Sequence, residues 1–211
     1  AMFIILAAFI DGIDGRVARL LNASSEFGVQ MDSLADFFNF GIAPGFIMYF
    51  WQMHNLDSFG RIGWVAVLLL AICMAIRLAR FNVDTPTEDK DSPLVKYFFK
   101  GIPAPAAGLL VLFPLIATIE FGACFYSSPV FVTINTMIIA LLAGSTIPTP
   151  CFKKIKIKPA YKNIVILLFA IILIGLVTKL WLTMSIIGVS YLIMIVCGWF
   201  FYAKFKKQIK K

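Results

Sequence analysis

The sequence predicts an all-α fold, a polytopic bundle of transmembrane helices, and two observations lead to this prediction. Of the 211 residues, 61% are hydrophobic and only 14% are charged, whereas soluble domains average about 45–50% apolar and about 25% charged residues. Apolar runs also recur along the whole chain, with only short polar stretches between them. We therefore expect a single membrane domain that covers residues 1–211.

Seven apolar segments are expected, in order along the chain. The first is cut short by Asp11 and has only about ten apolar residues, fewer than the roughly 17–25 of a spanning helix, so we expect further sequence before residue 1. The other six are predicted to be complete spans. The seven segments cover residues 1–10, about 37–53, 62–76, 102–119, 129–147, 163–178 and 184–203.

Prolines in two of these segments bear on the predicted helices. Pro103 and Pro105 open the segment 102–119, and proline is ordinary in the first turn of a helix. Pro44 lies inside the segment 37–53, where we expect it to kink the helix and to open a polar cavity.

The basic residues predict the orientation of the bundle. If the spans alternate, residues 16–26, 77–100, 151–162 and 204–211 share one side and carry 17 of the 19 lysines and arginines. The positive-inside rule makes this side cytoplasmic, with the end of the chain inside. The basic side chains would also contact anionic lipid headgroups. No nucleic-acid-binding motif accompanies them, so we expect no nucleic-acid partner.

The stretch "DGIDGRVARLLNASSEFGVQMDSLAD" (residues 11–36) places four aspartates beside or inside the apolar segments. A charge within a span costs about 2.5–3.5 kcal/mol, so such residues usually face a cavity or a partner. Asp11 and Asp14 are three residues apart and share one helix face. Asp32 and Asp36 are four apart and do the same. Two helices joined by the short turn "LLNASSE" would run antiparallel, so we expect the four carboxylates to converge near the cytoplasmic end.

Converging carboxylates repel one another and would take up protons unless cations neutralise them. Oxygen ligands without cysteine or histidine favour Mg²⁺, Mn²⁺ or Ca²⁺ over zinc. The four scattered cysteines and the single histidine, His54 in an expected external turn, indicate neither a zinc site nor a disulfide framework. Two divalent ions about 3.5–4 Å apart form an arrangement that clamps phosphoryl groups during displacement. The four aspartates therefore predict phosphate chemistry at the membrane surface.

Four residues between the aspartates suit the same chemistry. Gly15 and Gly28 have no side chain, so a ligand can approach the backbone closely there. The small side chain of Ala18 also leaves room for a ligand on the helix face. Arg19 has the fork geometry that holds a phosphate through two hydrogen bonds. Taken singly, each has a structural explanation as well, such as helix packing for Gly28 and membrane anchoring for Arg19, and neither explanation is excluded.

Residues 11–36 match the pattern D-x2-D-G-x2-A-R-x8-G-x3-D-x3-D at every fixed position. In this the chain resembles the CDP-alcohol phosphotransferase family. The resemblance implies an integral membrane enzyme, often a homodimer, that moves a substituted phosphate from a CDP-linked donor to an alcohol and releases CMP. It also implies two bound Mg²⁺ or Mn²⁺ ions, a general base and a surface for the CDP part of the donor. The residues so assigned are Asp11, Asp14, Asp32 and Asp36 for the metals, Asp36 also as the base, and Gly15, Ala18, Arg19 and Gly28 for the donor.

Three further stretches, "DSLADFFNFGIAPGF", "AIRLARFNV" and "FFKGIPAPAAG", resemble the phosphatidylserine synthases within that family. Members that make phosphatidylglycerol phosphate tend to have proline in place of Ser33. The resemblance implies CDP-diacylglycerol as the donor and L-serine as the acceptor. It also implies a place in a prokaryotic inner membrane, with the active site and the C-terminus facing the cytoplasm.

Arg77, Arg80 and Asn82 are candidates for holding the acceptor or a phosphate. The two arginines share one helix face at the cytoplasmic end of a span, where they would bind the carboxylate of serine or a donor phosphate. Membrane anchoring with snorkelling is the alternative. A phosphorylated acceptor, such as glycerol 3-phosphate or inositol phosphate, would also need arginines, so charge does not select the alcohol. A cation transporter is a more distant alternative, because the acids cluster at one membrane face.

Overall fold

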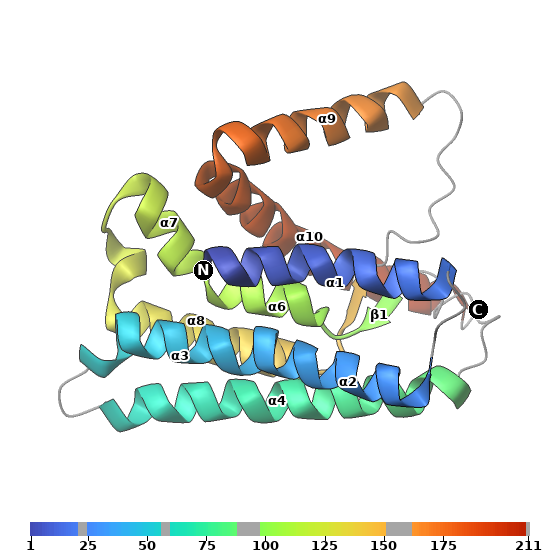
Figure 1. Cartoon of the computed structure of the whole chain (residues 1–211), viewed down its shortest axis with the longest axis horizontal. Helices are drawn as coiled ribbons and strands as arrows, with labels where there is room; N and C mark the ends of the chain where they lie inside the picture. Colours follow the sequence, from blue (N-terminus) through green and yellow to red (C-terminus); the bar gives the residue numbers. More distant parts are fainter. Residues whose placement is uncertain (21–24, 56–59, 88–97, 151–161, 210–211) are drawn as a thin grey trace.

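The computed structural model describes residues 1–20, 25–55, 60–87, 98–150 and 162–209, and helix covers each predicted apolar segment (Figure 1). The all-α prediction holds, apart from one pair of three-residue strands among the described residues. The elements are α1 (Met2–Leu20), α2 (Glu26–Asp36), the π-helix η1 (Phe37–Ile42), α3 (Ala43–Trp51), the 3₁₀-helix η2 (Met53–Asn55), α4 (Gly60–Thr87), β1 (Phe98–Lys100), α6 (Ala104–Val111), α7 (Phe113–Phe121), the 3₁₀-helix η3 (Phe125–Ser127), α8 (Pro129–Gly144), β2 (Pro148–Pro150), α9 (Lys162–Thr178) and α10 (Leu180–Ile209).

The predicted number of membrane spans is only partly supported by the helix lengths. Among the described helices, α4 is long and apolar enough to cross a membrane over Arg61–Val83. The pair α6 and α7, which meet at an angle of 47°, would be a second if the two form one span. Four further apolar helices in the described part are shorter, with 10–17 residues. The count of seven spans therefore stays a prediction.

The bend between α6 and α7 has a local cause in Pro114, which lies in the first turn of α7. Proline has no N–H, so it cannot donate to the carbonyl of Leu110 four residues earlier. The side-chain amide of Asn135 on α8 takes that place, donating through Nδ2 to the Leu110 carbonyl oxygen at 3.2 Å. The bent pair is thus held by a neighbouring helix, which is how proline is usually tolerated inside apolar helices.

Pro44 affects the second helical segment differently from the expected kink. The chain runs from α2 through η1 into α3 without a break, and Pro44 is buried in the first turn of α3. The N–H of Ala43 bonds to the carbonyl of Phe38, five residues earlier, which is the π-helical pattern. The wider π-turn accommodates the proline ring, and the predicted opening of a polar cavity stays a prediction.

The first three helical segments lie antiparallel in succession, with α2, η1 and α3 returning beside α1 and α4 reversing the direction again (Figure 1). Close packing of η1 and α3 on α4 depends on two glycines four residues apart. A Cβ on Gly41 would lie 3.1 Å from Cβ of Met74, and one on Gly45 would lie 3.1 Å from Cγ1 of Val67. Small residues at this spacing let helix backbones approach, which is a main source of helix association in membranes.

The two ends of the bundle differ in chemistry. At one end, two aromatic rings of α3 pack against Trp64 of α4: Tyr49 is tilted toward it with ring centroids 4.6 Å apart, and Phe46 meets it edge to face at 5.5 Å. At the other end, β1 pairs with β2 in antiparallel register and joins the segment before α6 to the segment after α8. The helix α2, which bears two of the signature aspartates, begins at this second end (Figure 1).

Candidate functional site

The structure brings three of the four signature aspartates together, as the antiparallel arrangement predicts. The side chain of Asp36, the last residue of α2, hydrogen-bonds to that of Asp11 on α1. Burial raises the pKa of Asp36 from its ordinary value of 3.8 to about 7. The negative charges of Asp11 and Asp32 also raise this pKa, and the positive charge of Arg77 lowers it. Among the side chains that the structure describes, the site is therefore an acidic group with the cation of Arg77 beside it.

The remaining signature residues on α1 are described through their backbone alone. The helix α1 continues to Leu20, so Asp14 and Ala18 follow Asp11 by three and seven residues and lie on the same helix face. Gly15 and Arg19 are also within α1. The roles predicted for these four residues stay predictions.

The acidic group has the composition that a divalent cation needs, although the described side chains do not form a complete site. Among them, no three acidic, cysteine or histidine residues are arranged as a metal-binding group, and the side chain of Asp14 lies outside the described part. The hydrogen bond between Asp36 and Asp11 shows two carboxyl groups close enough to share a proton. A cation in place of that proton would relieve the repulsion between them. An all-carboxylate donor set suits Mg²⁺ or Mn²⁺.

Gly28 lies in the first turn of α2 and takes part in the helix cap. Its N–H donates to Oγ of the N-cap residue Ser25 at 3.0 Å. A Cβ at position 28 would lie 3.1 Å from that same oxygen, so the cap alone gives a local reason for a small residue here. Donor binding by Gly28 stays a prediction beside this structural role.

Arg77 faces the aspartates from α4. Its Nε donates a hydrogen bond to the carbonyl oxygen of Ile102, just before α6. Its positive charge acts on Asp36 from α4. The guanidinium group therefore connects the loop before α6 with the acidic group, and it is placed to hold an anion there.

Arg80 is three residues further along α4, but its side chain binds a different part of the molecule. Its two terminal nitrogens donate to the carbonyl oxygens of Ser145 at 3.3 Å and Gly144 at 3.2 Å. These carbonyls are at the C-terminus of α8, where the last backbone acceptors of a helix have no helical partner. A cation here also interacts favourably with the helix dipole. The two arginines, predicted as a pair, thus have separate partners.

Asn82 contacts α2 instead of the arginines. Its side-chain amide donates through Nδ2 to Oγ of Ser33 at 3.0 Å, and Ser33 lies directly after Asp32. Ser33 was not predicted as a site residue, although the resemblance to the phosphatidylserine synthases distinguishes this position from the proline of related enzymes. The hydrogen bond across 49 residues of sequence shows how Ser33 is connected with the site.

Tyr191 of α10 is a second residue that the sequence did not indicate. It is half-buried, packs against the core, and interacts electrostatically with Arg77. A tyrosine in an apolar helix is usual, so nothing in the pattern around it points to the site. Its position shows that the last helix reaches the neighbourhood of the acidic group.

Comparison of the sequence with known proteins gives one family and several relatives. A sequence model of the family described as CDP-alcohol phosphatidyltransferase matches residues 1–144. The CDP-diacylglycerol–serine O-phosphatidyltransferase of Mycobacterium leprae is 37% identical over 187 residues, which are 88% of this chain and 60% of that protein. Proteins with the same name from Helicobacter pylori and Bacillus subtilis are 41% and 33% identical, covering 74% and 72% of this chain and 62% and 75% of those proteins. The chain thus spans about three fifths of the length of the first two relatives.

Proposed function

The chain belongs to the CDP-alcohol phosphatidyltransferase family, and on this premise we propose that it transfers the phosphatidyl group of CDP-diacylglycerol to L-serine. The products would be phosphatidylserine and CMP. The names of the relatives support this reaction. The structural observation that carries the proposal is the meeting of Asp11, Asp32 and Asp36 beside Arg77. An acidic, cation-binding group next to a positive charge that can hold the acceptor suits the transfer of a phosphate group to an amino acid.

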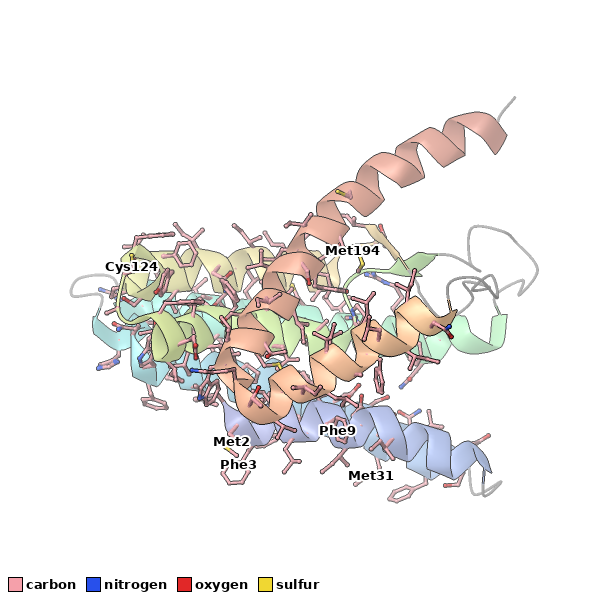
Figure 2. The ribbon with its side chains drawn as sticks, turned by 90° about the horizontal axis from the view of Figure 1, so that it is seen from above. Met2, Phe3, Phe9, Met31, Cys124 and Met194 are labelled. Carbon is pink, nitrogen blue, oxygen red and sulfur yellow. The ribbon has the colours of Figure 1, made fainter. Side chains whose placement is uncertain are left out.

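The proposed setting is a prokaryotic inner membrane crossed by seven segments, with the site and the C-terminus at the cytoplasmic face. The uneven distribution of lysine and arginine supports this orientation. Apolar side chains of α1 and α2 also point outward, among them Phe3, Phe9 and Met31, which lie along one outer edge (Figure 2). The acyl chains of the donor would remain in lipid beside this edge. A homodimer is expected from the family resemblance.

The acidic group would hold two divalent cations, Mg²⁺ or Mn²⁺. When bound, these ions neutralise the diphosphate and stabilise charge that develops on its oxygens. The aspartates proposed as ligands are Asp11, Asp14, Asp32 and Asp36. The residues proposed to contact the CDP part of the donor are Gly15, Ala18, Arg19 and Gly28.

The chemical step proposed for the protein side chains is proton transfer with an oriented acceptor. Asp36 accepts the proton of the serine hydroxyl, as a general base. The hydroxyl oxygen forms a bond to the phosphorus that carries diacylglycerol, while the bond from this phosphorus to the bridging oxygen of CMP breaks. CMP leaves with the electron pair. Arg77 holds the serine carboxylate, since it stands beside Asp36 and a guanidinium group has five N–H donors.

CMP release from CDP-diacylglycerol tests the proposal directly. Full-length protein in detergent receives Mg²⁺ or Mn²⁺ and one acceptor at a time, chosen from serine, glycerol 3-phosphate and inositol phosphate. We expect release with serine only, phosphatidylserine as the lipid product, and no turnover by a folded Asp36→Asn variant. Release with another acceptor would retain the family chemistry and reject serine. Folded protein that is silent with every acceptor would reject the transferase function.

A further inference from the structure

We propose that Ser33 and Asn82 are a positioning pair that holds the aspartates of α2 in place against Arg77 of α4. This inference rests on the proposed function, since it assigns these aspartates to the reaction. Asn82 would then act through α2 and would not touch the acceptor, in contrast to the role that the sequence suggested for it.

The hydrogen bonds around Ser33 form a short directed chain. The Asn82 amide donates to Ser33 Oγ at 3.0 Å, and Ser33 Oγ lies 3.1 Å from the carbonyl oxygen of Val29, one turn earlier in α2. The serine hydroxyl has one hydrogen and two lone pairs. It can therefore donate to Val29 and accept from Asn82 at the same time. The Asn82 carbonyl oxygen, 3.2 Å from Oγ, offers the hydroxyl a second acceptor.

The helix α2 depends on such a bond more than the other helices that bear site residues. None of its residues is fully buried, and the apolar side chains of Phe27, Met31 and Leu34 are exposed. Little apolar packing within the protein therefore fixes its position. At its C-terminal end it continues directly into η1, where Phe40 is fully buried. The Ser33–Asn82 bond attaches α2 to α4, within the turn that separates Asp32 from Asp36.

The geometry links this attachment to the site on both helices. Ser33 is next to Asp32 and three residues before Asp36, so a shift of Ser33 moves both carboxylates. Asn82 is five residues from Arg77 on the same helix, α4. Fixing Ser33 to Asn82 therefore sets the separation between the acidic group and its neighbouring cation. A displacement near 1 Å in such a group is enough to lower the rate of a reaction substantially.

The test compares Ser33→Ala, Asn82→Ala and the double variant with wild type in three measurements. These are the kinetics with serine, Mn²⁺ binding followed by electron paramagnetic resonance without substrates, and hydrogen–deuterium exchange of the α2 amides. Each single variant should lower kcat and weaken Mn²⁺ binding about tenfold, the effect of losing one hydrogen bond. Exchange within α2 should become faster. The double variant should be no worse than either single variant, because both remove the same bond.

Two matched controls remove the same kinds of group elsewhere. Ser190→Ala deletes a hydroxyl that donates to Ile187 within α10, and Asn135→Ala deletes the amide bonded to Leu110. Both should leave Mn²⁺ binding and α2 exchange unchanged, although Asn135→Ala should lower thermal stability. Ser33→Thr keeps the hydroxyl and should retain wild-type kcat.

Three results would overturn the proposal: additive losses in the double variant, α2 exchange unchanged in both single variants, or a higher KM for serine from Asn82→Ala with kcat and Mn²⁺ binding unchanged. The last would show that Asn82 contacts the acceptor. If wild-type protein releases no CMP with any acceptor, the proposed function fails, while Mn²⁺ binding and α2 exchange still decide whether the pair positions the aspartates.

Discussion

Replacing Arg80 by alanine should destabilise the fold without affecting the acceptor. The side chain makes two hydrogen bonds, to the carbonyl oxygens of Ser145 and Gly144 at the end of α8. Substitution leaves both carbonyls without this donor and removes the cation from the C-terminus of the helix. The arginine therefore stabilises the contact between α4 and α8, which is the most extensive helix pair in the core.

The size of the effect follows from the geometry of these bonds. A hydrogen bond from a charged donor contributes about 1.5–3 kcal/mol. The two distances, 3.3 and 3.2 Å, are long for N–H···O, and the groups are only partly buried. We therefore take less than the lower value for each bond and add a small helix-dipole contribution, which gives about 2–3 kcal/mol in total. For a protein of this size the melting temperature should fall by roughly 5–10 °C.

The measurement is thermal unfolding in one detergent, combined with the kinetics of CMP release. Arg80→Lys keeps the charge but loses the fork that reaches both carbonyls, so its melting temperature should lie between those of wild type and Arg80→Ala. Arg61→Ala, which removes an exposed arginine at the other end of α4, is the control and should unfold like wild type. The KM for serine should be unchanged in all three. An unchanged melting temperature of Arg80→Ala together with a raised KM for serine would refute the capping role and restore Arg80 as an acceptor ligand.

Three further outcomes are expected. Arg77→Lys should fold like wild type but raise the KM for serine at least about tenfold, because lysine cannot form the bidentate contact with a carboxylate; an unchanged KM would remove Arg77 from the acceptor site. Gly108→Val should lower the melting temperature by several degrees, since a Cβ there would lie 3.1 Å from Cα of Phe40, an overpacking that costs about 1–3 kcal/mol; wild-type unfolding would contradict this packing. The third outcome concerns the free energy of unfolding in metal-free buffer. Asp36 holds its proton more tightly in the folded state, with a pKa of about 7 against 3.8. As the pH rises from about 4 to about 7, the free energy of unfolding of wild type should therefore decrease relative to that of Asp36→Asn. Parallel pH profiles in the presence of a chelator would contradict this raised pKa.

Much of the helical structure could be predicted because it depends on local pattern. An apolar run must satisfy its own backbone hydrogen bonds, so the place of each helix along the chain follows from the pattern of apolar residues. The spacing of Asp11, Asp32 and Asp36 also determined their meeting, since two helices joined by a short turn must be antiparallel. The exception was Pro44, where the sequence indicates a strained helix but not the π-turn that accommodates it.

The tertiary structure alone decided how the polar side chains around the aspartates are used. Arg77 and Arg80 have the same charge and share a helix face, yet one faces the acidic group and the other caps α8. Ser33 meets Asn82 across 49 residues of sequence. Periodicity along one helix gives the direction of a side chain but not the neighbour found in that direction. That neighbour depends on the rotation and height of a second helix, which the close packing of the whole bundle determines.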